Sequence, residues 1–137
     1  MKTIATILVT FLISNYAIGQ HSGASHGATA PELIYKKKLD MPGLEGKEVR
    51  MGIVTYAPGE VSPPHRHPIA IFGYVLEGEI EITFEGEKTI KKKGDPFYEQ
   101  PEGLHNGTRN LSKTKPAKLL VYFLGDEGKP LLVLEPK

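Results

Sequence analysis

Turn-forming residues recur along this chain at short intervals, and their spacing limits what it can fold into. The sequence holds 15 glycines and 11 prolines among 137 residues. Beyond residue 30 they leave segments of about 8–12 residues. No window places apolar residues at the i, i+3, i+4 and i+7 positions of a long helix. Apolar and polar residues alternate instead, as at Ile80, Ile82 and Phe84. The spacing therefore predicts an all-β fold, an antiparallel sandwich or barrel of short strands.

Several of the expected strands carry further information. Residues 88–93 are rich in Lys, which is typical of an edge strand. Residues 119–124 form a continuous apolar run, which is typical of a strand buried on both faces. The expected strands are residues 33–37, 49–55, 71–77, 80–84, 88–93, 97–99, 119–124 and 131–134.

Residues 1–19 have the pattern of a cleavable export signal. Lys2 supplies a positive charge, residues 4–13 are apolar, and small residues precede a cut expected between Gly19 and Gln20. A membrane anchor would need about 20 apolar residues, and Ser14 ends the run early. We therefore expect a secreted or periplasmic protein with no membrane contact after cleavage. Residues 20–31 are then a flexible linker and residues 32–137 one domain.

The charge balance and the absence of cysteine exclude several kinds of site. Without Lys2, the 17 basic residues become 16, which match the 16 acidic residues. A neutral chain without a basic stripe argues against nucleic acid as a partner. There is no cysteine, so disulfides and thiol chemistry are excluded. Stability must come from burial, helped by a metal ion or a second subunit.

A pair of histidines is the most informative local pattern. His65 and His67 are two residues apart, so in a strand both rings lie on one face with Cβ atoms roughly 6.5–7 Å apart. Both rings can then ligate one ion through a neutral nitrogen. His105 follows a strand and a Pro/Gly turn, and a second strand end of this kind can deliver a third ligand. The alternative is that all three are surface residues at turns.

The residues around these histidines resemble the two sequence motifs of the cupins. Residues 74–78 and 97–99 resemble small single-domain bacterial cupins in particular. The resemblance covers roughly residues 33–134, and it implies a double-stranded β-helix, the cupin jelly-roll barrel. The matching positions are Gly59, His65, His67 and Gly78 in the first motif, and Gly94 and His105 in the second.

The same resemblance implies a metal site, with one departure. The family pattern places a metal-binding glutamate at position 71 or 72, where this chain has Ile71 and Phe72. Glu99, at the end of the strand that leads to His105, is the candidate replacement. The alternative is a solvated turn residue. The implied cofactor is a divalent transition metal, namely Fe, Mn, Ni, Cu or Zn, bound by His65, His67, His105 and Glu99.

Two functions follow from this resemblance, and the choice between them stays open. The first is a small metal-dependent oxidoreductase, dioxygenase-like, acting on a diketone, thiol or polyphenol. The second is a non-catalytic cupin that binds a metal or a small ligand. In either case the partner is a small molecule, and no catalytic residue is assigned. Metal binding is expected to weaken as the pH falls through the histidine range, around 6.5.

Strand alternation also predicts an oligomer. If Ile71 and Val75 face the interior, then Phe72, Tyr74 and Leu76 face outward. Three adjacent large apolar side chains are more than a monomer usually exposes. We therefore expect a homodimer. The alternative is that the N-terminal strands cover these residues within one subunit.

Overall fold

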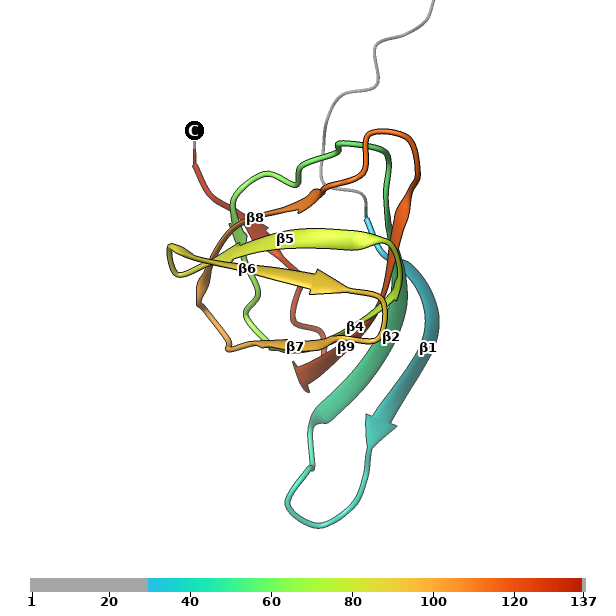
Figure 1. Cartoon of the computed structure of the whole chain (residues 1–137). Coiled ribbons are helices and arrows are strands. Elements are labelled where there is room, and N and C mark those ends of the chain that lie inside the picture. The colour runs from blue at the N-terminus through green and yellow to red at the C-terminus, as the bar shows by residue number, and fades with distance from the viewer. Residues whose placement is uncertain (1–29, 137) are drawn as a thin grey trace, which may run out of the picture.

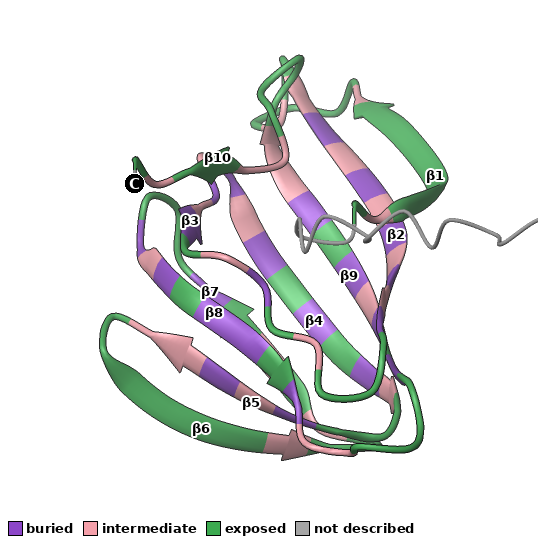
Figure 2. Cartoon of the chain, turned by 90° about the horizontal axis from the view of Figure 1, so that it is seen from above, coloured by how far each residue is buried: buried purple, intermediate pink, exposed green. Residues whose placement is uncertain are grey.

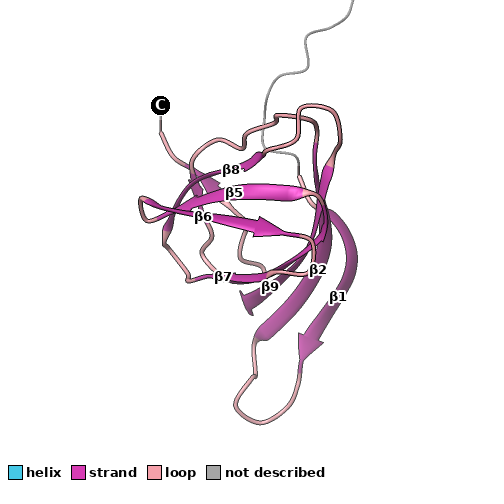
Figure 3. Ribbon diagram, in the orientation of Figure 1, coloured by secondary structure: helices cyan, strands magenta, loops and turns pink. Residues whose placement is uncertain are grey.

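Strands make up most of the described part of the chain, residues 30–136, in this computed structural model (Figure 1). No helix lies within these residues (Figure 3), and therefore none long and apolar enough to span a bilayer. The all-β expectation is confirmed. The expected export signal and most of the linker lie outside the described residues. The strands are β1 (Glu32–Leu39), β2 (Lys47–Tyr56), β3 (His65–Arg66), β4 (Ala70–Glu77), β5 (Glu79–Phe84), β6 (Glu87–Lys92), β7 (Pro96–Glu99), β8 (Leu104–Asn110), β9 (Ala117–Asp126) and β10 (Val133–Leu134).

The strands form two five-stranded antiparallel sheets (Figure 2). Sheet A has the order β1-β2-β9-β4-β7, and sheet B has the order β10-β3-β8-β5-β6. The chain changes sheet at every step from β2 to β5 and again from β6 to β10. Apart from the hairpins β1–β2 and β5–β6, sheet neighbours are therefore distant in sequence, as where Val54 pairs with Leu119. This winding is the double-stranded β-helix that the resemblance to cupins implies.

The core lies between the two sheets because the strands present alternate residues to it. Along β2 every second residue is buried. Ile71 and Val75 of sheet A belong to one buried cluster with Ile80 and Ile82 of sheet B. This confirms the expected inward face of β4. Polar residues share the interior as well, among them the histidines of both motifs and Glu99.

The strand over residues 119–124 differs from its expectation. Leu119, Val121 and Phe123 are buried in the core. Leu120 lies on the other face and is only half-buried, and Tyr122 is 37% exposed. The prediction of a strand buried on both faces is therefore wrong for a single chain, because no other layer of residues 30–136 covers the outer face of sheet A.

The two long outer strands are at opposite edges of the sandwich. β6 forms one edge of sheet B and is largely exposed, which confirms the edge expected from its lysines. β1 forms one edge of sheet A and is exposed along nearly its whole length. Beneath β1, the buried carboxylate of Glu48 lies 3.0 Å from Lys36 Nζ and 3.2 Å from Arg50 Nε. β2 therefore buries an ion-paired carboxylate beside the edge strand β1.

Candidate metal centre

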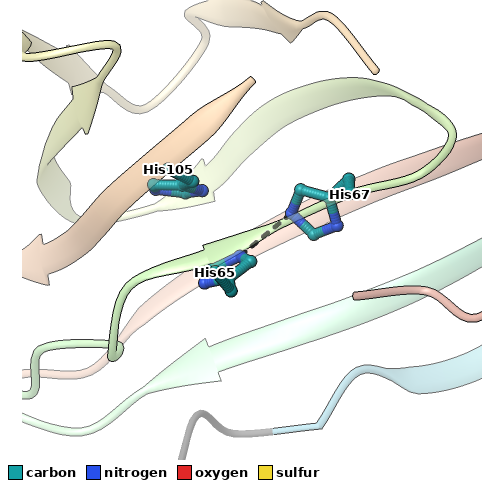
Figure 4. Close-up of side chains that lie close together, drawn as sticks. All are labelled: His65, His67 and His105. Carbon is teal, nitrogen blue, oxygen red and sulfur yellow. Dashed lines mark hydrogen bonds between the residues drawn. The ribbon is translucent and has the colours of Figure 1, made fainter. Parts of the chain in front are cut away.

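The three motif histidines meet inside the sandwich. His65 lies on β3 directly opposite His105 on β8, and His67 follows β3 on the same side. All three side chains are buried, and each offers one nitrogen within 4.8 Å of the others. Figure 4 shows the three imidazoles gathered between their strands. The structure thus brings the predicted trio together, and these residues are not surface histidines at turns.

Backbone carbonyl groups determine which ring nitrogens of the first pair carry protons. His65 Nδ1 lies 2.9 Å from the Pro63 carbonyl oxygen, and His67 Nδ1 lies 2.5 Å from that of Leu131. A carbonyl oxygen only accepts, so both Nδ1 atoms donate and both Nε2 atoms keep their lone pairs. Both neutral rings therefore present an unprotonated nitrogen to the same space.

The spacing of these two nitrogens fits a shared ion. His65 Nε2 and His67 Nε2 are 3.0 Å apart, the pair joined by the dashed line in Figure 4. When both Nδ1 atoms are the donors, no proton remains to form a hydrogen bond between the Nε2 atoms. Two nitrogens that each bind one ion at about 2.1 Å, at an angle of roughly 90°, lie about 3.0 Å apart. The pair therefore has the geometry of two ligands on one metal.

Thr108 orients the third histidine. His105 Nε2 lies 2.9 Å from Thr108 Oγ1, and the Thr108 backbone N–H in turn donates to Ser62 Oγ at 2.8 Å. His105 Nδ1 is buried and makes no hydrogen bond within residues 30–136. It faces Glu99, whose Oε2 lies 3.1 Å away without the alignment of a hydrogen bond. The cluster therefore contains another ring nitrogen without a hydrogen-bond partner.

Glu99 is part of this cluster and not a solvated turn residue. It is 2% exposed, at the end of β7, and its Oε2 also lies 3.5 Å from His67 Nε2. Neither carboxylate oxygen has a hydrogen-bond partner within the described chain. A buried carboxylate in this state is unfavourable unless a cation compensates it. Glu99 pairs directly opposite Ile71, so the two side chains lie on the same face of sheet A.

Burial keeps the first two histidines neutral. It lowers the pKa of His65 from 6.5 to about 4, against the opposing effect of the hydrogen bond to the Pro63 carbonyl. Burial likewise lowers the pKa of His67. Neutral imidazole is the form that binds metals. The weakening of metal binding around pH 6.5 stays a prediction, and burial keeps the metal-free ring of His65 neutral to a lower pH than that.

A small cavity of about 60 Å³ adjoins the cluster. A buried water takes about 10–15 Å³ by this measure, so the cavity holds roughly four to six water-sized groups. No Lys or Arg lies among its described lining residues. Burial raises the pKa of Tyr56, so its hydroxyl remains protonated at neutral pH. Besides the histidines and Glu99, the lining consists of Pro31, Val54, Tyr56, Ser62, Ile71, Phe97, Thr108, Leu119, Val121, Phe123, Leu131 and Leu132.

Sequence reasoning missed Thr108, Tyr56 and the Leu131 carbonyl. Thr108 reaches His105 because β8 shifts register between Thr83 and Phe84 of its partner β5. Gly107 has a φ of 142°, and a Cβ there would lie 2.7 Å from the Ser62 carbonyl oxygen. The glycine at this position was the available signal, since an isolated glycine in a strand often marks a bulge. The other two groups depend on long-range register and left no local signal.

Comparison with known proteins agrees with this geometry. The cupin domain model matches residues 52–123. Germin-like protein subfamily 2 member 4 of Arabidopsis thaliana is 39% identical over 88 residues, which are 59% of this chain and 39% of that protein. The cupin-domain-containing oxidoreductase srdB of Neurospora crassa is 41% identical over 86 residues, which are 62% of this chain and 41% of that protein.

A solved structure from Klebsiella pneumoniae subsp. pneumoniae, with a double-stranded β-helix domain, has a TM-score of 0.59 at 20% identity. The match covers 79% of this chain and 84% of that one, and it supports the fold alone. This chain spans about two fifths of the length of the two curated relatives. With the family model matching over half of its length, the chain belongs to the cupin family.

Proposed function

We propose that this chain binds one divalent transition metal ion through His65, His67 and His105, with Glu99 as the fourth ligand. The observation that carries the proposal is the pair of unprotonated Nε2 atoms 3.0 Å apart beside a buried carboxylate without a hydrogen bond. Imidazole and carboxylate ligands suit Fe, Mn, Ni, Cu and Zn. The negative charge of Glu99 replaces the charge that the family pattern places at position 71 or 72.

We further propose that the bound metal supports oxidoreductase chemistry on a small molecule, in a dioxygenase-like reaction. An ion with four protein ligands retains open positions for a substrate and for O₂ or water. The chain supplies a cavity whose apolar walls limit the access of water, and the Tyr56 hydroxyl is a protonated donor within it. The cavity volume favours a substrate with only a few non-hydrogen atoms in the buried part.

A non-catalytic cupin that holds a metal or small ligand is the second candidate. One observation favours it: once Glu99 and the histidines are ligands, no further carboxylate or imidazole is among the residues of the described chain that line the cavity. The raised pKa of Tyr56 also makes this residue a poor base. A reaction that needs a separate general base is therefore disfavoured, whereas simple binding or chemistry with O₂ is not.

Metal analysis followed by oxygen uptake tests both proposals. Protein without a polyhistidine tag should hold one ion per chain, and His105→Ala protein should hold almost none. His21→Ala is a control, because His21 is not one of the proposed ligands. The same metal content per chain in wild-type and His105→Ala protein contradicts the proposal that these histidines bind the ion. Oxygen uptake with small diketones, thiols or phenols by the loaded wild type supports the enzyme, and its absence supports the binding protein.

Export, domain division and assembly also remain proposals. Residues 1–19 are proposed to be cleaved on export to the periplasm or medium, leaving a linker over 20–31 and the domain over 32–137. Their support is the charge and apolar pattern of the sequence. We expect the intact mass of a chain that begins at Gln20. A mass that includes residues 1–19 contradicts the proposed cleavage. The expected homodimer depends on sheet A, not on the metal.

A further inference from the structure

A second and larger space opens on the side of the sandwich where the edge strands β6 and β7 lie. It is a groove of about 230 Å³, separate from the cavity beside the histidines. We propose that this groove binds a small aromatic carboxylate, with the ammonium group of Lys91 as its counter-ion. The proposal does not depend on bound metal. The groove is lined by Ile82 and Phe84 of β5, by Glu87, Thr89 and Lys91 of β6, and by Phe97, Tyr98 and Glu99 of β7.

The groove exists because the inward face of β6 is polar. Glu87, Thr89 and Lys91 alternate along the strand and therefore lie on one face. Lys91 and Thr89 pair directly opposite Ile80 and Ile82 of β5, which are buried in the core. None of the residues of β6 belongs to that core. Two packed sheets are about 10 Å apart, and the polar side chains of β6 leave this space open where apolar ones would fill it.

The floor of the groove is apolar and partly aromatic. The rings of Phe84 and Phe97 border it, and each ring packs closely against the backbone at a glycine. A Cβ at Gly103 would lie 2.1 Å from Phe84 Cζ, and one at Gly73 would lie 1.9 Å from Phe97 Cζ. The two rings are therefore held in place beside the open space. A flat aromatic ligand can pack against such rings edge to face or offset, at centroid distances of about 4.5–7 Å.

The size of the groove fits one aromatic ring with a small substituent. An apolar cavity of about 150 Å³ is sufficient to bind benzene. The groove has about 230 Å³, which leaves room for a carboxylate beside the ring. The cavity at the histidines has only about 60 Å³ and is too small for a ring. The two spaces therefore suit ligands of different size.

Lys91 differs from the neighbouring lysines of β6. It is half-buried, whereas Lys88 and Lys92 are exposed. Lys88 Nζ lies 3.4 Å from Glu81 Oε1, but no carboxylate within residues 30–136 pairs with Lys91. A lysine at such a rim packs its carbon stem on apolar surface and keeps its ammonium group in water. This ammonium group can therefore form a charge-assisted hydrogen bond with the carboxylate of a ligand.

The two acidic residues of the groove lie away from this end or face another direction. Glu87 is four residues from Lys91, or about 13 Å along the strand, and charges this far apart in water are largely screened beyond about 8 Å. Glu99 is buried, and its Oε2 lies 3.1 Å from His105 Nδ1. A ligand anion is therefore favoured beside Lys91, with its ring extending over the floor towards Glu87.

An NMR titration of ¹⁵N-labelled full-length protein with benzoate tests the proposal. The amide shifts should concentrate on β6 and β7, and Lys91→Gln should weaken binding by about tenfold or more, the effect of a charge-assisted hydrogen bond. Lys92→Gln, next to it and exposed, is the matched control and should bind as the wild type does. Benzamide has the same shape without the charge, and acetate has the charge without the ring. Both should bind at least about tenfold more weakly than benzoate.

Several results would overturn the proposal. These are the absence of saturable shifts with benzoate, equal benzoate affinity in wild-type and Lys91→Gln protein, and an equal loss of affinity in Lys92→Gln. Benzylamine carries a cation that would pair with Glu87 instead. Binding of benzamide or benzylamine as tight as that of benzoate therefore also contradicts the assignment of Lys91.

A filled groove and removal of metal locate the site without changing Lys91. Thr89→Trp places a large ring in the groove and should abolish benzoate binding. Ile90→Trp is its matched control, because Ile90 lies on the opposite face of β6 and is 61% exposed; binding should persist. Chelator-treated protein should bind benzoate as the untreated protein does. Binding that disappears with the metal, or that persists in Thr89→Trp, contradicts a site in this groove, whereas the proposed metal site does not depend on either result.

Discussion

Replacing Glu99 by glutamine should change stability and metal affinity in opposite directions. In metal-free protein the carboxylate is buried beside the histidine nitrogens without a hydrogen bond. An unpaired buried charge is more unfavourable than an unpaired neutral amide, so Glu99→Gln should stabilise the metal-free protein by about 1 kcal/mol. For a domain near 100 residues this raises Tm by roughly 4–8 °C. Loss of a charged ligand should weaken metal binding by about 3 kcal/mol, or roughly 100-fold in Kd.

Thermal unfolding of chelator-treated protein and metal titration by calorimetry measure the two effects. Glu79→Gln is the matched control, since Glu79 is an exposed carboxylate on β5. It should leave the metal Kd unchanged. A lower Tm for metal-free Glu99→Gln, or a Kd within threefold of the wild type, would refute the assignment of Glu99 as a ligand.

The position opposite Glu99 offers a rescue experiment. Ile71 is the direct cross-strand partner of Glu99 and is also buried. In the Glu99→Gln background, Ile71→Glu should restore part of the metal affinity, because a carboxylate again reaches the same centre. Ile71→Glu alone should destabilise the metal-free protein, because two buried carboxylates then lie side by side. Equal metal affinity for Glu99→Gln with and without Ile71→Glu contradicts this geometry.

Three further predictions concern His105, His65 and Gly73. His105→Ala should lower bound metal to less than about a tenth of the wild-type content by elemental analysis; retention of half or more contradicts its role. His65 is neutral above pH 6.5 in both states, and between pH 6.5 and 4 only the unfolded state takes up a second proton on this ring, because the folded-state pKa is about 4. In that window metal-free wild type should lose about 3 kcal/mol of unfolding free energy relative to His65→Gln in urea titrations; parallel pH profiles contradict this. A Cβ at Gly73 would lie 1.9 Å from Phe97 Cζ, so Gly73→Ala should destabilise by about 1–3 kcal/mol in urea unfolding, and Phe97→Leu should relieve part of the loss.

The local pattern of apolar and polar residues was sufficient to predict most of the strands. The features that it did not predict depend on pairing between strands distant in sequence. Alternation on β4 correctly placed Ile71 inside and Phe72 outside. The apolar run of β9 was misread because a period-two signal disappears when both faces are apolar. Tyr122 then lies on the outer face of sheet A, which intramolecular packing leaves uncovered. The two-residue strands β3 and β10 have no period of their own, and they exist only through pairing with β8 and with each other.

The residues of the candidate site also fall into those predictable from local sequence and those that depend on strand pairing. His65 and His67 were predictable from their spacing, and His105 from its place after a strand and a turn. The proximity of Glu99 to them depends on the register that sets it opposite Ile71. Thr108 reaches His105 only through the irregularity at Gly107. Both features depend on the pairing of β7 with β4 and of β8 with β5, which joins segments distant in sequence whose relative register a single sequence does not encode locally.

The hydrogen bond from His67 to the Leu131 carbonyl links metal binding to the movement of a distant segment. Residues 131–135 are held by the two pairs of β10 with β3, by Glu135 N–H donating to the Pro64 carbonyl, and by Arg66 Nε with Glu135. So short a strand opens by local unfolding more readily than the core strands do. Each opening removes the acceptor that keeps the His67 proton on Nδ1. By thermodynamic linkage, an ion that requires this tautomer makes the open state less populated, and slower amide hydrogen exchange at Glu135 becomes a remote reporter of metal occupancy.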